Sequence, residues 1–180
     1  MNERRFHGDL DRLRSPERLE RMDVPHVVDL CLEGITATQV LDIGSGTGVF
    51  AEAFVARGLD TTGIDINPAM VEAGNSLVPG ARFMLAPAEA PPFADASFDL
   101  VFLGHVLHET DDARGALREA RRIARVRVAV LEWPYREEEV GPPLAHRLKA
   151  EDVEALAREA GFTAVETLPL SHMVLFRMEK

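Results

Sequence analysis

The chain has 180 residues, 46% of them hydrophobic, and a net charge of −10. This length suits one domain with a core of ordinary size, and the acidic charge argues against a general binder of nucleic acid or of anionic membranes. The single cysteine, Cys31, excludes an internal disulfide framework and a cysteine-rich metal site, so we expect a reducing compartment and no bound metal. No signal peptide and no membrane-spanning run is recognisable, which predicts a cytoplasmic protein.

Residues 1–36 are predicted to form a helical cap. Ser15-Pro16-Glu17 is a suitable helix start, because it combines an N-cap, a first-turn proline and an acid near the positive end of the helix. Pro25 opens a second helix, for which Gly34 is a suitable stop. Amphipathic helices of this kind either cover a sheet edge or help to shape a binding site, and the pattern does not choose between the two.

The next stretch, Val40-Leu41-Asp42-Ile43-Gly44-Ser45-Gly46-Thr47-Gly48, is the most informative part of the sequence. Its apolar residues predict a strand buried on both faces of a parallel sheet. Glycine at every second position then predicts a turn where backbone approaches a ligand closely, and apolar spacing after Gly48 predicts a helix. A strand, a glycine loop and a helix are typical of a nucleotide-binding corner, although an ordinary glycine turn would also fit.

The spacing of the glycines favours one class of nucleotide. Dinucleotide sites use G-x-G-x-x-G, and phosphate loops need a lysine that is absent here. This loop is G-x-G-x-G, preceded by Asp42, whose carboxylate would repel a pyrophosphate but can hold an ammonium group directly or through water. The combined D-x-G-x-G-x-G pattern resembles the first motif of the class I S-adenosylmethionine (SAM)-dependent methyltransferases. The resemblance places the methionine end of SAM at four loop residues, namely Gly44, Ser45, Gly46 and Gly48.

A second predicted strand over residues 60–66 carries Asp65 at its end, seventeen residues after Gly48. A carboxylate there can accept hydrogen bonds from both hydroxyls of a ribose. Ile66, which follows it, belongs to the same predicted cofactor set. The alternative role for Asp65, an N-cap of the next helix, is weakened because Asn67-Pro68 already supplies a cap and a first-turn proline.

The run from Arg82 to Val101 contains a third predicted strand over residues 82–86 and then Pro87-Ala88-Glu89-Ala90-Pro91-Pro92-Phe93. This run, with Ser-Phe-Asp after it, resembles the second methyltransferase signature. Pro87 stands where that family often has an acid for the adenine amino group. The resemblance therefore assigns adenine to the backbone N–H of Ala88 and the carboxylate of Glu89; a proline-rich surface loop is the alternative.

The fourth predicted strand, residues 98–103, leads into Gly104-His105-Val106-Leu107-His108-Glu109. Gly104 lets backbone approach the methionine part of SAM. His105 and His108 are the predicted catalytic residues, as a general base or a polar clamp near the acceptor. A structural hydrogen-bonding role is the alternative for both histidines, and a metal site would need a further ligand besides Glu109.

The remaining sequence predicts a helix after Thr110, a fifth strand over residues 126–131 and a helix over about residues 150–160. Two closing strands are predicted over residues 162–168 and 172–178. Trp133 and Tyr135 lie either at the rim of the site or in the core. The charged, proline-rich loop 136–143 is a place where a lid could sit. From about residue 25 to the end, the chain resembles small relatives of the quinone-biosynthesis C-methyltransferases.

We therefore expect one methyltransferase domain over residues 1–180, with a helical cap at 1–36, a SAM-binding core at 37–135 and a closing helix and strands at 136–180. The resemblance implies an α/β, Rossmann-like, doubly wound sheet of seven mostly parallel strands, the last antiparallel, with helices on both faces. It implies methyl transfer from SAM to an O, N or C nucleophile of a small-molecule acceptor, with S-adenosylhomocysteine (SAH) as product and no nucleic-acid or membrane partner.

Three other functions compete with this interpretation. An RNA or protein methyltransferase is disfavoured by the acidic charge. A nicotinamide-dependent oxidoreductase would also use Asp65, but it would need a different glycine spacing and no Asp42. A non-catalytic SAM-binding module would keep the cofactor residues without a usable acceptor pocket. The acceptor and the oligomeric state do not follow from the sequence.

Overall fold

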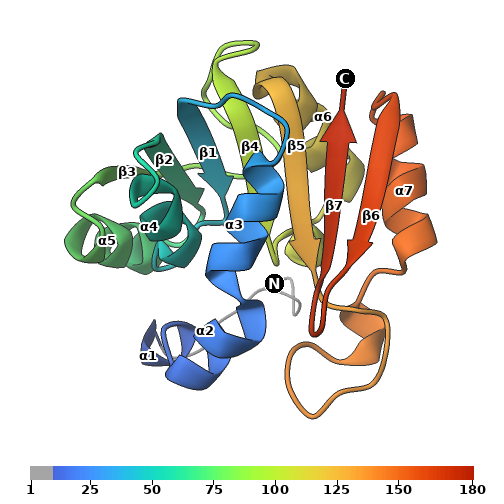
Figure 1. The fold of residues 1–180 in the computed structure, drawn as a ribbon, viewed down its shortest axis with the longest axis horizontal. Helices are drawn as coiled ribbons and strands as arrows, with labels where there is room; N and C mark the ends of the chain where they lie inside the picture. Colours follow the sequence, from blue (N-terminus) through green and yellow to red (C-terminus); the bar gives the residue numbers. More distant parts are fainter. Residues whose placement is uncertain (1–9) are drawn as a thin grey trace.

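The computed structural model describes residues 10–180 and shows one twisted sheet of seven strands in the order β3-β2-β1-β4-β5-β7-β6 (Figure 1). The strands are β1 Gln39–Ile43, β2 Asp60–Asp65, β3 Ala81–Leu85, β4 Phe98–Gly104, β5 Ala124–Glu132, β6 Ala164–Pro169 and β7 Val174–Glu179. Neighbouring strands pair in parallel, except that β7 runs antiparallel to both β5 and β6.

Helices cover both faces of this sheet and one of its ends. The helices of the described residues are α1 Leu10–Leu13, α2 Pro16–Met22, α3 Val24–Leu32, α4 Val49–Val55, α5 Pro68–Leu77, α6 Ala113–Ile123 and α7 Ala150–Glu159, with short 3-10 turns η1 Leu107–Glu109 and η2 Leu144–His146. No helix among these is long and apolar enough to cross a membrane.

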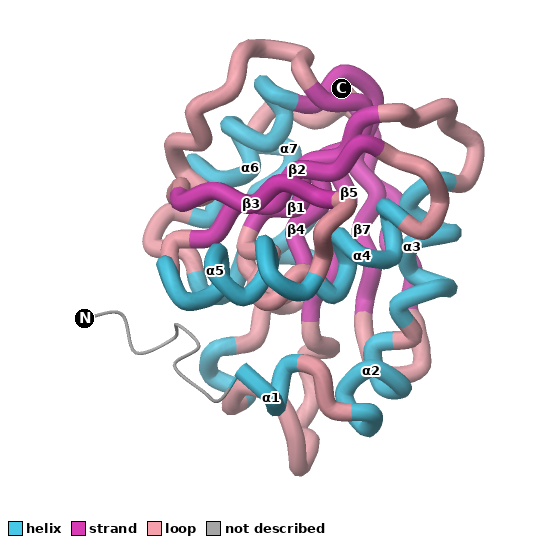
Figure 2. The backbone as a smooth tube through the Cα atoms, turned by 90° about the vertical axis from the view of Figure 1, so that its left-hand side faces the viewer, coloured by secondary structure: helices cyan, strands magenta, loops and turns pink. Residues whose placement is uncertain are grey.

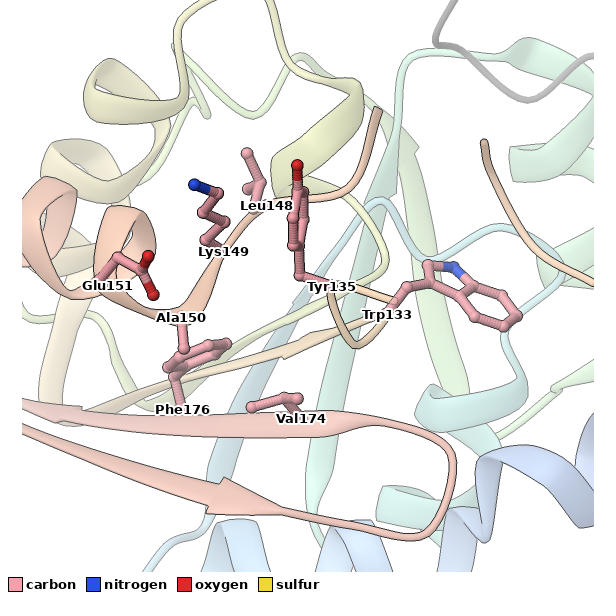
Figure 3. Close-up of a pocket in the computed structure, with 8 residues that line it drawn as sticks. All are labelled: Trp133, Tyr135, Leu148, Lys149, Ala150, Glu151, Val174 and Phe176. Carbon is pink, nitrogen blue, oxygen red and sulfur yellow. The ribbon is translucent and has the colours of Figure 1, made fainter. Parts of the chain in front are cut away.

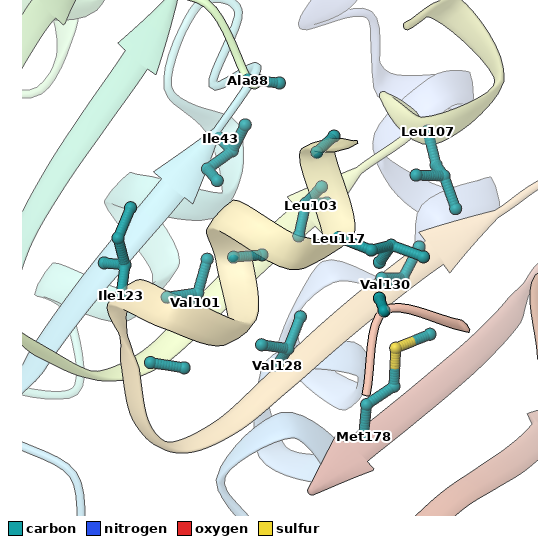
Figure 4. Packing of buried hydrophobic residues seen from close by; sticks show 14 of the residues in the cluster. Ile43, Ala88, Val101, Leu103, Leu107, Leu117, Ile123, Val128, Val130 and Met178 are labelled. Atoms are coloured by element: carbon teal, nitrogen blue, oxygen red, sulfur yellow. The ribbon is translucent and has the colours of Figure 1, made fainter. Parts of the chain in front are cut away.

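The central strands are buried on both faces, as their apolar sequences predict. In β4, Val101 and Leu103 pack with α6 and α7, whereas Leu100 and Phe102 pack with α3 and α4, because successive side chains of a strand point to opposite faces. Figure 4 shows the first of these layers, with Leu117 of α6 lying over Val130. The two layers hold the strand ends rigidly, and the loops that carry the site start from those ends.

The amino-terminal helices lie beyond the carboxyl ends of the parallel strands. Figure 1 shows α1 and α2 below the arrowheads of β1 and β5, and the turned view of Figure 2 places both helices at the same end. The predicted capping is confirmed: the Ser15 side chain accepts from the N–H of Arg18, and the Asn67 side chain caps α5. The cap thus lies at the end of the sheet where ligands of open α/β folds bind.

The predicted sheet is confirmed, with small differences at element ends. The third strand ends at Leu85, one residue early, and the fifth extends back to Ala124. The closing strands begin two residues later than expected, at Ala164 and Val174. These shifts follow from tertiary pairing, which decides where a ladder of hydrogen bonds stops and which local sequence does not encode.

Candidate active site

One cavity of about 860 Å³ opens at the carboxyl ends of the strands. One side is formed by the glycine loop after β1 and the ends of β2 and β4. The other side is formed by α1, α2, η1 and the loop before η2. A volume near the upper end of the usual range for ligand pockets leaves room for a cofactor and a second small molecule.

Asp42 lies at the floor of this cavity and is 2% exposed. In the register of the sheet it stands between Gly63 of β2 and Phe102 of β4. Its Oδ2 has no hydrogen-bond partner among the described residues. Burial and, to a smaller extent, repulsion from Asp65 raise the pKa of Asp42 to about 8. A hydrogen bond from the backbone of Ala51 acts in the opposite direction and lowers this pKa. A buried carboxyl oxygen without a partner indicates a ligand that brings a hydrogen-bond donor.

Asp65 lines the same cavity at the end of β2. Its Oδ2 accepts from the N–H of Gly46 at 2.9 Å, and its Oδ1 accepts from the N–H of Asn67 at 2.8 Å. Burial raises the pKa of Asp65, and these backbone donors oppose the rise. Each carboxylate oxygen can accept a second hydrogen bond, so the side chain is oriented and still able to bind hydroxyls. Next to it, Ile66 is 43% exposed and offers an apolar surface in the cavity.

The glycine loop is shaped by close packing as well as by its ligand face. Gly44 has a φ of +66°, and a Cβ there would collide with the side chain of Val106. Gly44, Ser45 and Gly46 line the cavity. Gly48 is not among the lining residues: its φ is +81°, and a Cβ would lie 2.7 Å from the ring of Phe83. Gly48 therefore serves the packing of α4 rather than direct contact with a ligand.

Ala88 and Glu89 also lie in the cavity, on the loop after β3. Ala88 is buried, whereas Glu89 is partly exposed and accepts from the N–H of Asp111 at 3.3 Å through Oε1. The structure thus brings together, in one cavity, every predicted cofactor residue except Gly48.

Gly104 at the end of β4, and the two predicted catalytic histidines that come after it, also line the cavity. His105 has a left-handed backbone with φ +60° and is buried, and both its ring nitrogens are without a hydrogen-bond partner among the described residues. Burial, with the nearby charges of Arg18 and His108, holds the pKa of His105 well below its usual value. His105 is therefore a neutral, unpartnered polar group that faces the cavity.

His108 differs because the structure pairs it with an acid that sequence reasoning had not given a role. Its Nδ1 lies 2.7 Å from Oε2 of Glu132, and both side chains are almost completely buried. Burial lowers the pKa of His108, but the charge and hydrogen bond of Glu132, helped by Glu109, outweigh it and raise the pKa. Like Asp42 and Asp65, Glu132 is an acid at the end of a buried strand, and that signal could have found it.

Replacing Glu132 by glutamine should lower the free energy of unfolding in a pH-dependent way. The raised pKa of His108 means that the charged pair stabilises the fold fully below about pH 6.5, the unfolded value, and that this contribution is lost as pH rises through the higher folded value. We expect a loss of about 1.5–3 kcal/mol at pH 6 and a smaller loss at pH 9. Urea denaturation of the wild type and of Glu132→Gln at the two pH values measures this difference in the free energy of unfolding.

The control for this comparison is His108→Gln. In that background Glu132→Gln should show no difference between the two pH values, because the titrating partner is gone. An equal loss from Glu132→Gln at both pH values in the wild-type background would contradict a charged pair.

The acceptor side of the cavity is formed by residues that the motifs did not identify. They come from α1, α2 and the loop before η2, and comprise Arg12, Leu13, Arg18, Met22, Gly141, Pro142, Pro143 and His146. The buried guanidinium of Arg147 fixes the loop, because it donates to the backbone carbonyls of Pro134, Val140 and Pro142. The predicted lid position is thus a wall of the cavity that Arg147 holds in place.

Trp133 separates this cavity from a smaller one of about 330 Å³. Figure 3 shows the indole of Trp133 turned away from Tyr135, which stands beside Lys149 in the smaller cavity. In the large cavity the indole contacts the ring of His105, with ring centroids 5.1 Å apart. Of the two aromatic residues, Trp133 reaches both cavities, whereas Tyr135 lines only the smaller one. No group of side chains in the described part of the chain has the composition of a metal site.

Comparison with known proteins identifies the class that this fold and cavity define. Residues 41–130 match a family described as a methyltransferase domain. A SAM-dependent methyltransferase from Aquifex aeolicus has the same fold, with a TM-score of 0.83 and 22% identity over 94% of this chain and 95% of that one.

The chain therefore belongs to the class I SAM-dependent methyltransferases, a family of enzymes whose cofactor is SAM. An uncharacterized methyltransferase of Mycobacterium tuberculosis is 35% identical over 118 residues, covering 65% of this chain and 48% of that protein. The demethylmenaquinone methyltransferase of Renibacterium salmoninarum is 33% identical over 99 residues, covering 55% and 41%. The chain spans about half the length of these curated relatives.

The cavity fits this cofactor on its own chemistry. Asp42 offers an unpartnered buried oxygen, and the left-handed Gly44 leaves backbone open where a side chain would collide. Asp65 and Ile66 add an oriented carboxylate next to an exposed apolar side chain. These groups suit the ammonium, the ribose and the base of SAM.

Proposed function

We propose that this protein transfers the methyl group of SAM to an O, N or C nucleophile of a small-molecule acceptor. The observation that carries the proposal is the buried, unpartnered Oδ2 of Asp42, because it sits in one cavity with an oriented Asp65 and with a separate wall of histidines. A dinucleotide would bring a pyrophosphate to this loop, and a pyrophosphate offers no hydrogen-bond donor to Oδ2 of Asp42 and would oppose ionisation of its carboxyl group.

The cofactor side has a defined division of work in this proposal. Asp42 holds the ammonium group, Asp65 accepts from the ribose hydroxyls, and Ile66 lies against the base. Ala88 offers its backbone N–H, and Glu89 accepts from the adenine amino group. Each assignment follows from the chemistry of a side chain or backbone group that lines the cavity or borders a lining residue.

On the acceptor side the histidines have different tasks. SAM, when bound, supplies an activated methyl group on its sulfonium. His108 is the stronger base, since Glu132 raises its pKa, and a neutral ring that donates from Nδ1 to Glu132 leaves Nε2 to take a proton. His105 stays neutral and orients the nucleophile. The α1–α2 cap and the loop fixed by Arg147 exclude water and align the reactants, which is the main contribution needed when the methyl donor is already activated.

Isothermal titration calorimetry with SAM, SAH and NADH tests this proposal. We expect SAM and SAH to bind with micromolar dissociation constants, about −8 kcal/mol, and NADH not to bind. Release of SAH is then measured with a library of small acceptors. Binding of NADH without binding of SAM would overturn the proposal, and tight SAM binding without turnover on any acceptor would leave a SAM-binding module.

A further inference from the structure

Two arginines face the acceptor side of the cavity, Arg12 from α1 and Arg18 from α2. Elsewhere in the described chain most arginines pair with a carboxylate, as Arg14 does with Glu52 at 2.8 Å. Within the part of the chain that the structure describes, Arg12 and Arg18 have no carboxylate oxygen within the 4.0 Å of an ion pair. Arg12 and Arg18 are thus two cavity-lining cations without an ion-pair partner among the described residues.

Arg18 is partly buried, and its surroundings explain why an anion would be favourable there. Burial and the charge of Arg12 lower the pKa of Arg18, and Glu109 opposes them. Oε1 of Glu109 lies 3.8 Å from Nε2 of His108, so the carboxylate of Glu109 interacts with His108 as well as with Arg18. His105, which lines the cavity close enough to feel the charge of Arg18, is neutral. Two like charges held at one cavity wall repel each other, and an anion between them would remove that cost.

Apolar side chains also line this side of the cavity. They are Leu13 and Met22 from the cap, Val106 from the turn after β4, Trp133 just after β5, and Pro142 and Pro143. Asp65, whose Oδ2 accepts from the N–H of Gly46, would repel an anion placed at the glycine loop. We therefore expect a ligand with an apolar body and one acidic end to bind with its acidic end at the arginines.

We infer that the acceptor is a small organic acid whose carboxylate binds to Arg18, with Arg12 adding charge, while its apolar body lies against Trp133 and Met22. A guanidinium group matches a carboxylate with two parallel hydrogen bonds, a geometry that a neutral amide cannot reproduce. Arg18 is then a specificity-determining residue of the acceptor site. The inference rests on the proposed function, because it places the acid beside bound cofactor.

Trp133 is the only tryptophan of the chain, and it lines the cavity, so its fluorescence reports binding without any turnover. The probes are two acids and their amides: benzoate with benzamide, and 3-phenylpropionate with 3-phenylpropionamide, each titrated into SAH-saturated protein. We expect the acids to bind roughly tenfold or more tightly than the amides. Arg18→Met should abolish this preference and leave amide affinity unchanged, because it keeps an apolar stem and removes the charge.

The matched control is Arg21→Met on the same helix, since Arg21 contacts His172 and does not line the cavity. It should keep the preference for acids. Equal binding of acids and amides by the wild type, no signal from any probe, or a preference that survives Arg18→Met would overturn the inference while the proposed function stands. Failure of SAH itself to bind in calorimetry would instead overturn the proposed function and the inference with it.

Discussion

Replacing Asp65 by alanine is expected to weaken SAM binding by roughly 100-fold or more. The reason is that a carboxylate held by the N–H groups of Gly46 and Asn67 presents its remaining lone pairs in a fixed direction, and hydrogen bonds to a charged acceptor contribute about 1.5–3 kcal/mol each. Two ribose hydroxyls would lose their partner at once. Calorimetric titration of SAM into wild type and Asp65→Ala measures the change.

Two variants separate ligand contact from damage to the loop. Asp65→Asn keeps one side-chain oxygen for the backbone donors and should bind SAM with intermediate affinity. Asp60→Ala changes an exposed acid at the other end of the same strand, paired with Arg82, and should bind SAM like the wild type. If Asp65→Ala keeps wild-type affinity and an unchanged melting temperature, Asp65 has no part in the site.

The affinity for SAM is expected to rise about tenfold per pH unit between about pH 6 and pH 8 and then to level off. An ammonium group binds the carboxylate form of Asp42, but burial and Asp65 raise its pKa to about 8, so the free protein carries a proton there at lower pH. Binding must release that proton. Calorimetry in buffers of different ionisation enthalpy should therefore detect release of close to one proton near pH 7.

The same group makes a prediction about stability without ligand. Because the folded pKa of Asp42 lies above the ordinary value of 3.8, the free energy of unfolding should fall as pH rises from about 4 towards 8. Asp42→Asn, which cannot titrate, should reduce this slope to the part contributed by Asp65 and His108, and it should remove the pH dependence of SAM binding that Asp42 causes. A wild-type SAM affinity that stays constant over this range would show that Asp42 is already ionised and contacts no ammonium group.

The cofactor half of the site could be predicted because its residues are consecutive or follow strand ends. Asp42 and the glycines after it lie within one strand–turn–helix unit, and a few adjacent residues determine the backbone conformation of this unit. Parallel strands end at one edge of a sheet, so Asp65, Ala88 and Gly104 were expected beside that loop, and the cavity contains all of them. Gly48 is the exception, since its neighbour Phe83 is 35 residues away and no local pattern shows that contact.

The sequence by itself determined the buried strands and the glycine turn, because each depends on apolar periodicity or on short-range backbone geometry. The cofactor class followed from the resemblance of the D-x-G-x-G-x-G stretch to a methyltransferase motif. Only the tertiary structure decided which acid orients His108, since Glu132 lies 24 residues further along the chain, at the end of β5. It alone placed Arg18 and the loop held by Arg147 in the cavity. These contacts depend on how separate elements pack against one another. The amphipathic pattern of a helix does not specify which other element its polar residues will contact.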